Sequence, residues 1–131
     1  MVRPVPPAPG CSASVGLTVS DADTAVAARS GDVPVLATPR VVALAEEAAV
    51  AAVVDSLDPG TTTVGYEVQL THIAPTPVGG RVTADAVLEH IDGRRLAFRV
   101  SVSDARGLVA AGRVTRVVVI RDRFVERASG D

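Results

Sequence analysis

Three side chains in the first half of the chain carry groups suited to acid–base or nucleophilic chemistry: Thr38, Glu46 and His72. A carboxylate can take a proton from water or attack a carbonyl carbon. An imidazole transfers protons near neutral pH, and a hydroxyl can orient either of the other groups. These groups can react together only if the fold brings them close. The helix and strand that carry them must therefore be predicted first.

Thr38 and Glu46 are predicted to lie on one helix. Residues 41–55 contain neither glycine nor proline, and residues 56–60 end the helical pattern. Thr38 is a suitable N-cap, and Pro39 suits the first helical position because it has no N–H that needs a partner.

Glu46 is predicted to lie on the apolar stripe of this helix. At about 100° per residue, Thr38 and Glu46 fall within about 40° of Val42. Glu47 falls on the opposite, charged side, together with Leu44. A carboxylate that faces a core must be hydrogen-bonded or functional, because an unpaired buried charge is strongly unfavourable. A contact with a dimer partner or with a backbone amide is the alternative explanation.

His72 is predicted at the end of a half-buried strand. Strict alternation places Val64, Tyr66, Val68, Leu70 and His72 on one apolar face. If this face covers the helix, His72 lies on the side of the sheet that receives Glu46. A histidine that is simply satisfied within the core is the alternative.

The remaining pattern is mostly strand-like. A short strand is expected at 14–20, a brief helix or irregular segment at 21–30, and strands at 62–73, 81–91, 95–103 and 108–121. Asp92-Gly93 marks a tight hairpin. One long helix followed by consecutive antiparallel strands predicts an α+β fold in which the sheet wraps around the helix, the hotdog arrangement.

The chain is expected to form one domain. Its 131 residues suffice for a single core. We expect residues 1–12 to be disordered because they are proline-rich, residues 13–125 to form the domain, and residues 126–131 to be a loose tail.

Composition argues against several classes of function. Aromatic residues make up only 2% of the chain and the net charge is -2, so binding to nucleic acid or to an anionic membrane is not expected. A single cysteine, Cys11, and no signal-peptide pattern favour the cytoplasm, and the absence of lysine suggests a bacterial genome of high GC content. No phosphate loop or metal-ligand motif is present, so neither cofactor nor metal is expected.

Several short motifs resemble those of the fluoroacetyl-CoA thioesterase family of hotdog proteins, over residues 33–120. They are Leu36-Ala37-Thr38, Glu46, Gly65, Thr71-His72, Ala74-Pro75-Thr76-Pro77 and the hairpin Asp92-Gly93-Arg94-Arg95-Leu96 with Arg99-Val100.

The resemblance implies a homodimeric acyl-CoA thioesterase with Thr38, Glu46 and His72 as its catalytic set. Glu46 would activate water or attack the thioester directly, His72 would transfer the proton, and Thr38 would orient the carboxylate or water. Gly65 matches a glycine whose backbone approaches the substrate across the dimer interface, and a β-bulge is its alternative explanation. CoA would enter only as part of the substrate.

Residues 29–35 depart from the family pattern, because they contain none of the aromatic side chains that the fluorine-selective member has in its lid. The acyl group is therefore not identified by the resemblance. A non-catalytic acyl-CoA-binding module and an acyl-CoA hydratase or dehydratase are the alternative functions.

Charge is unevenly distributed along the chain. Residues 94–131 contain nine arginines and four acidic residues, whereas residues 1–93 carry an excess of acidic residues. The arginines could contact CoA phosphates, which guanidinium groups bind in a bidentate manner. Protection of a solvated sheet edge is the alternative.

Overall fold

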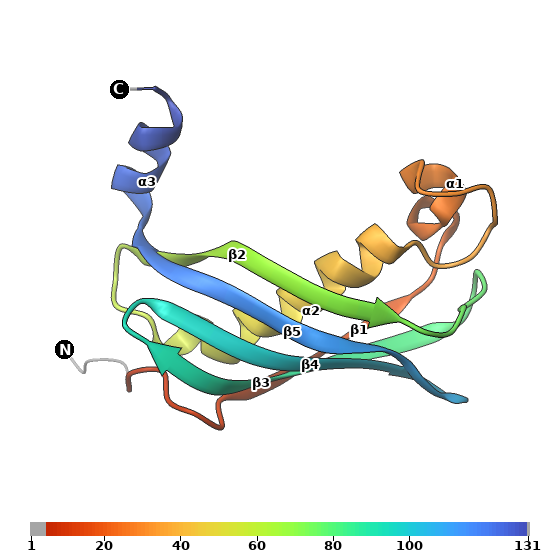
Figure 1. The fold of residues 1–131 in the computed structure, drawn as a ribbon, viewed down its shortest axis with the longest axis horizontal. Helices are drawn as coiled ribbons and strands as arrows, with labels where there is room; N and C mark the ends of the chain where they lie inside the picture. The colour runs from red at the N-terminus through yellow and green to blue at the C-terminus, as the bar shows by residue number, and fades with distance from the viewer. Residues whose placement is uncertain (1–4, 131) are drawn as a thin grey trace.

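A five-stranded antiparallel sheet curls around one long helix (Figure 1). The computed structural model describes residues 5–130. The helix is α2 (Thr38–Val53), and the strands are β1 (Ser12–Thr18), β2 (Thr61–His72), β3 (Arg81–Asp92), β4 (Arg95–Asp104) and β5 (Gly107–Ile120). Their order across the sheet is β1-β3-β4-β5-β2. The predicted α+β hotdog arrangement is confirmed.

The strands form because buried and exposed side chains alternate along them. In β3, Val82 and Ala84 are buried and face α2, whereas Arg81 and Asp85 on either side of them are exposed. Alternation of this kind has the period of a strand and gives the sheet one dry face. The β3–β4 hairpin closes at Gly93, whose φ of 61° is the left-handed conformation that such a tight turn requires.

The buried face of α2 differs from the predicted stripe. Its fully buried members include Val41, Leu44, Ala45 and Ala48, and Leu44, expected on the solvated side, is 0% exposed. The prediction failed because nearly every residue of this helix is Ala, Val or Leu, so the apolar pattern fixes the helical phase poorly. Glu46 therefore lies at the flank of the buried face.

Three short elements and a terminal helix complete the chain. They are η1 (Asp21–Asp23), α1 (Ala25–Ala28), η2 (Val54–Ser56) and α3 (Arg121–Ala128). Helices α1 and α3 lie at opposite ends of the molecule (Figure 1). The helix α3 was not expected from the sequence, and it extends past residue 125, where the domain was predicted to end.

Residues just before the predicted domain start at residue 13 contact the sheet. The strand β1 begins at Ser12, and the Gly10 N–H donates to the carbonyl of Leu88 at 2.8 Å. Residues 1–4 and Asp131 lie outside the described residues. No helix among residues 5–130 is long and apolar enough to cross a membrane.

The strand β2 is an outer strand of the sheet, and it contains a bulge. It pairs with β5 along one side only, and its register shifts between Gly65 and Glu67. Tyr66 is the extra residue, and its ring lies on the outer face beneath the guanidinium of Arg95, 4.6 Å from the ring centroid. Strict alternation from Val64 to His72 was therefore wrong, because a bulge reverses which residues face inward.

Candidate active site

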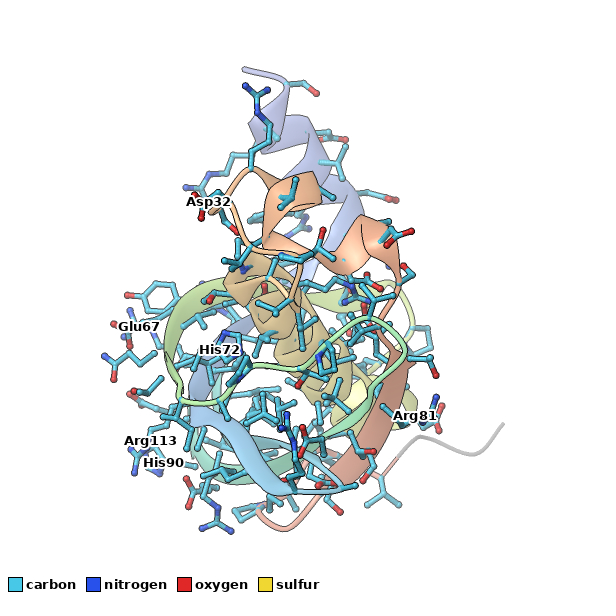
Figure 2. All side chains as sticks on the ribbon, turned by 90° about the vertical axis from the view of Figure 1, so that its right-hand side faces the viewer. Asp32, Glu67, His72, Arg81, His90 and Arg113 are labelled. Atoms are coloured by element: carbon cyan, nitrogen blue, oxygen red, sulfur yellow. The ribbon has the colours of Figure 1, made fainter. Side chains whose placement is uncertain are left out.

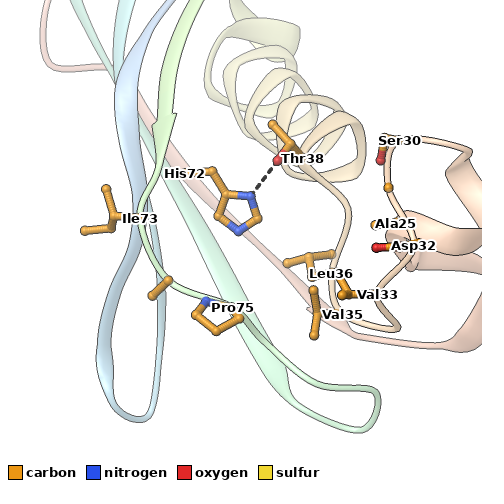
Figure 3. A pocket seen from close by; sticks show the side chains of 12 residues that line it. Ala25, Ser30, Asp32, Val33, Val35, Leu36, Thr38, His72, Ile73 and Pro75 are labelled. Carbon is orange, nitrogen blue, oxygen red and sulfur yellow. Dashed lines mark hydrogen bonds between the residues drawn. The ribbon is translucent and has the colours of Figure 1, made fainter.

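Thr38 and His72 meet at one end of the sheet. Thr38 Oγ1 and His72 Nδ1 share a hydrogen bond of 2.8 Å (Figure 3). Thr38 was predicted as the N-cap of the helix, but Ala37 occupies that position and no side chain caps the helix start. The Thr38 hydroxyl is thus available to hold the imidazole instead of a backbone amide.

The His72 side chain points to the inner side of the sheet, next to α2. Figure 2 shows it beneath the sheet, whereas Glu67, His90 and Arg113 project outward. The inward direction follows from the bulge, after which the even-numbered residues Val68, Leu70 and His72 face the helix. His72 Nε2 is buried and has no hydrogen-bond partner among residues 5–130. The ring thus has one nitrogen held by Thr38 and one that no described group satisfies.

The Thr38–His72 pair lines a pocket of about 350 Å³. One wall is the segment after α1, and the other is the chain that follows β2 (Figure 3). Backbone hydrogen bonds hold the first wall, because Ala25 N–H donates to Val35 O at 2.8 Å and Leu36 N–H donates to Thr76 O at 2.9 Å. Further lining residues are Ser30, Gly31, Asp32, Val33, Ile73, Ala74 and Pro75.

Glu46 is held by a buried arginine that sequence reasoning missed. Arg116 Nη1 donates to Glu46 Oε2 at 2.6 Å. The same guanidinium donates from Nε to Thr63 Oγ1 and from Nη2 to Thr63 O, at 2.9 and 3.0 Å. Arg116 is 8% exposed, whereas the Glu46 side chain is 32% exposed, so a buried guanidinium fixes the direction of a carboxylate that still reaches the surface. Because Arg116 and Glu46 are 70 residues apart, no local pattern could have predicted the contact.

Gly65 lies directly against the Glu46 carboxylate. A Cβ placed on Gly65 would be 2.6 Å from Glu46 Oε2, which is closer than such atoms approach. Gly65 also borders the register shift in β2. The alternative explanation of this glycine, a β-bulge, thus fits its place beside the register shift, whereas its approach to a substrate across a dimer interface stays a prediction.

The structure does not bring Glu46 to the Thr38–His72 pair within one chain. Thr38 and Glu46 are eight residues apart on α2, a rise of about 12 Å. Thr38 and His72 line the pocket described above, whereas Glu46 and Arg116 line a separate surface depression with Val50. A single chain therefore holds two separate groups, Thr38–His72 and Glu46–Arg116, which are candidate half-sites.

Asp23 anchors the segment that precedes the pocket wall. Its carboxylate accepts hydrogen bonds from the N–H and hydroxyl of Ser20 at 2.8 Å and pairs with Arg40 at 3.1 Å. The backbone N–H of Ser20, followed by smaller contributions from its hydroxyl and from Arg40, holds the pKa of Asp23 below its ordinary value despite partial burial. Within residues 5–130 no group of three or more metal-ligating side chains is gathered.

Comparisons with known proteins identify the family of this chain. The sequence model of the fluoroacetyl-CoA-specific thioesterase family matches residues 19–122. The fluoroacetyl-CoA thioesterase of Streptantibioticus cattleyicolor is 39% identical over 90 residues, which are 69% of this chain and 65% of that protein. The match thus spans slightly less than two thirds of the relative.

Solved structures extend the likeness to nearly the whole chain. A structure of the fluoroacetyl-CoA thioesterase FlK superposes with a TM-score of 0.89 at 29% identity, covering 94% of this chain and 96% of that one. A thioesterase superfamily member from Thermus thermophilus gives a TM-score of 0.82 at 27% identity, covering 99% and 100%. This chain therefore belongs to the fluoroacetyl-CoA-specific thioesterase family of hotdog proteins.

Proposed function

We propose that this protein is a homodimeric acyl-CoA thioesterase whose active sites each combine the two half-sites of different subunits. The observation that carries the proposal is the Thr38–His72 pair, with a buried and unpartnered Nε2, in a chain of this family that also retains a carboxylate at Glu46.

The outer strand β2 offers a way to join the half-sites. Gly65, beside Glu46, and His72, beside Thr38, lie on the same strand, with Val68 between them. The side of β2 away from β5 has unpaired backbone groups that favour pairing with a second strand. If two β2 strands pair antiparallel about a two-fold axis near Val68, Gly65 of one subunit faces His72 of the partner subunit. Two identical composite sites result.

The composite site contains the groups that thioester hydrolysis requires. Glu46, aimed by Arg116, takes a proton from water as the water oxygen attacks the thioester carbonyl. When the Thr38 hydroxyl donates to Nδ1, the neutral ring of His72 carries its proton on Nε2. That proton passes to the departing CoA sulfur as the C–S bond breaks. Direct attack by Glu46, giving a transient anhydride, begins from the same geometry. Water is the only co-reactant, so no cofactor is required.

The proposal is tested by measuring free thiol release from a panel of acyl-CoA esters of increasing acyl length. The wild-type protein should hydrolyse at least one ester with saturation kinetics. A variant with Thr38→Ala should fold, as judged by its thermal transition, and lose most of this activity. If no ester in the panel is hydrolysed while CoA esters bind, the protein is an acyl-CoA-binding module instead.

A further inference from the structure

A second pocket, remote from Thr38 and His72, lies under α3. Its volume is about 170 Å³, and it is an open depression lined by α3, the end of β5 and the β3–β4 turn. In Figure 1 this region lies at the opposite end of the sheet from α1. The lining residues are Arg94, Val119, Ile120, Arg123, Phe124 and Arg127.

Backbone contacts hold the walls of this pocket in place. The Arg121 N–H donates to Gly60 O at 3.0 Å and ties the start of α3 to the turn before β2. The Val118 N–H donates to Arg94 O at 2.8 Å and ties the β3–β4 turn to β5. Arg123 and Arg127 are one helical turn apart, so both lie on the face of α3 that lines the pocket.

The charge of the pocket is strongly positive. Three guanidinium groups line it and no carboxylate does, because Asp122 and Glu126 are not among the lining residues. Within residues 5–130 none of the three guanidinium groups makes an ion pair or a side-chain hydrogen bond, in contrast to Arg40, Arg99 and Arg116. The ring of Phe124 is 39% exposed beside them.

We propose that this pocket binds the phosphorylated adenosine end of the CoA substrate, an inference that rests on the proposed function. Guanidinium groups bind phosphate oxygens in a bidentate manner, and an exposed aromatic ring stacks on a purine base. A pocket with three unpaired arginines around one phenylalanine matches both parts of that ligand.

The distance to the composite site fits an extended pantetheine arm. Gly65 lies four residues from Thr61 on β2, a span of about 13 Å along the strand. Thr61 is next to Gly60, the residue to which α3 is tied. The start of α3 therefore lies about one strand segment from Gly65 along β2, a span that an extended pantetheine arm can bridge toward the Glu46 side of the proposed composite site.

The test compares two substrates that share the same acyl group. Acyl-CoA carries the nucleotide, whereas the N-acetylcysteamine thioester lacks it. With R123Q/R127Q, KM for acyl-CoA should rise at least about tenfold because charge-assisted hydrogen bonds to phosphate are lost, while kcat/KM for the N-acetylcysteamine thioester should stay within about twofold. Arg113→Gln, on the outer face of the sheet, is the matched control and should change neither value.

Binding of adenosine 3′,5′-bisphosphate, measured by calorimetry, tests independently of catalysis whether this pocket binds the nucleotide end of CoA. The wild-type protein should bind it and R123Q/R127Q should bind at least about tenfold more weakly. An unchanged affinity, or an equal loss of activity with both thioesters, would overturn the assignment of this pocket. If the wild type hydrolyses neither thioester yet binds the nucleotide through these arginines, the proposed function fails while the pocket stands.

Discussion

Glu46 and Glu47 are adjacent carboxylates that border the same surface depression but pair with different arginines. Arg116 holds Glu46 beside Gly65, whereas the Glu47 side chain is 50% exposed and pairs with Arg40 on the surface. Glu46→Gln should lower kcat between about 100-fold and 10,000-fold, because the amide can neither take a proton nor attack. Glu47→Gln should keep kcat within about twofold. Steady-state thiol release from both variants checks this, and equal kinetics would show that Glu46 is not the reacting carboxylate.

Gly65 is predicted to be required for the position of the Glu46 carboxylate. A methyl group in Gly65→Ala would meet Glu46 Oε2 at 2.6 Å, so the carboxylate must move away. We expect kcat to fall at least about tenfold with a stability loss of about 1 kcal/mol or less, because a side-chain end yields more easily than backbone. Gly16→Ala on β1 is the control, since its methyl group would displace only the guanidinium end of Arg81. Similar kcat values for the two variants would refute this role of Gly65.

At the scale of single residues, the sequence singled out Glu46 and His72 as candidates but did not predict the contacts that hold Glu46. The apolar positions around Glu46 and His72 and the family motifs singled out both residues. The pairing of Glu46 with Arg116 depends on the packing of α2 against β5, and the bulge at Tyr66 depends on the pairing of β2 with β5. Neither the ion pair nor the bulge leaves a repeating pattern in the nearby sequence. Both were therefore found only in the structure.

The segment η1–α1 holds the pocket wall, and Asp23 anchors this segment. Because the folded state holds the pKa of Asp23 below its ordinary value of 3.8, its carboxylate stabilises the fold above that pH and loses this effect as pH falls through the lower, folded value. Asp23→Asn should reduce the free energy of unfolding by about 1 kcal/mol at pH 7 and by progressively less below about pH 3.8. Urea unfolding at several pH values measures the difference.

Asp55→Asn, which removes an exposed carboxylate, is the control for Asp23→Asn. It should stay within about 0.5 kcal/mol of wild type at every pH. A destabilisation by Asp23→Asn that does not diminish in acid would show that the charge of Asp23 is not what stabilises the segment.

The pocket wall at 29–35 also bears on substrate choice. Ser30, Asp32, Val33 and Val35 line the pocket, and none of its lining residues is Phe, Tyr or Trp. We expect kcat/KM values for fluoroacetyl-CoA and acetyl-CoA within about tenfold of each other, after correction for intrinsic reactivity, because small apolar contacts discriminate weakly. Some bulkier acyl-CoA should be turned over better. Parallel steady-state assays that showed a preference of several orders of magnitude for the fluorinated ester would contradict this.

The strands could be predicted because apolar and polar residues alternate within each strand, and this pattern can be read from a short stretch of sequence. The strands expected at 81–91 and 95–103 are found at Arg81–Asp92 and Arg95–Asp104, with the turn at Gly93. The helix α3 was missed because its eight residues are mostly charged and carry no apolar stripe that faces the core. Its position depends on the tertiary contact between Arg121 and Gly60.

The whole molecule is expected to be a two-fold dimer, because a single chain leaves the half-sites apart. Thr38 and His72 lie at one end of the sheet and Glu46 near its middle, with an unpaired outer strand beside both. Light scattering after size exclusion should give twice the mass of one chain at micromolar concentration. A monomer that turns over acyl-CoA would exclude the composite site.

Complementation between two inactive variants tests the central claim most directly. Glu46→Gln and His72→Ala should each abolish activity in their own homodimers. Co-expression of the two chains produces mixed dimers in which one site carries both substitutions and the other carries neither. If the active site is shared between subunits, the mixture should regain about a quarter of wild-type acyl-CoA hydrolysis, because half of the dimers are mixed and one of two sites is intact in each. A mixture as inactive as its parents, with mixed dimers demonstrated by affinity tags, would contradict the account.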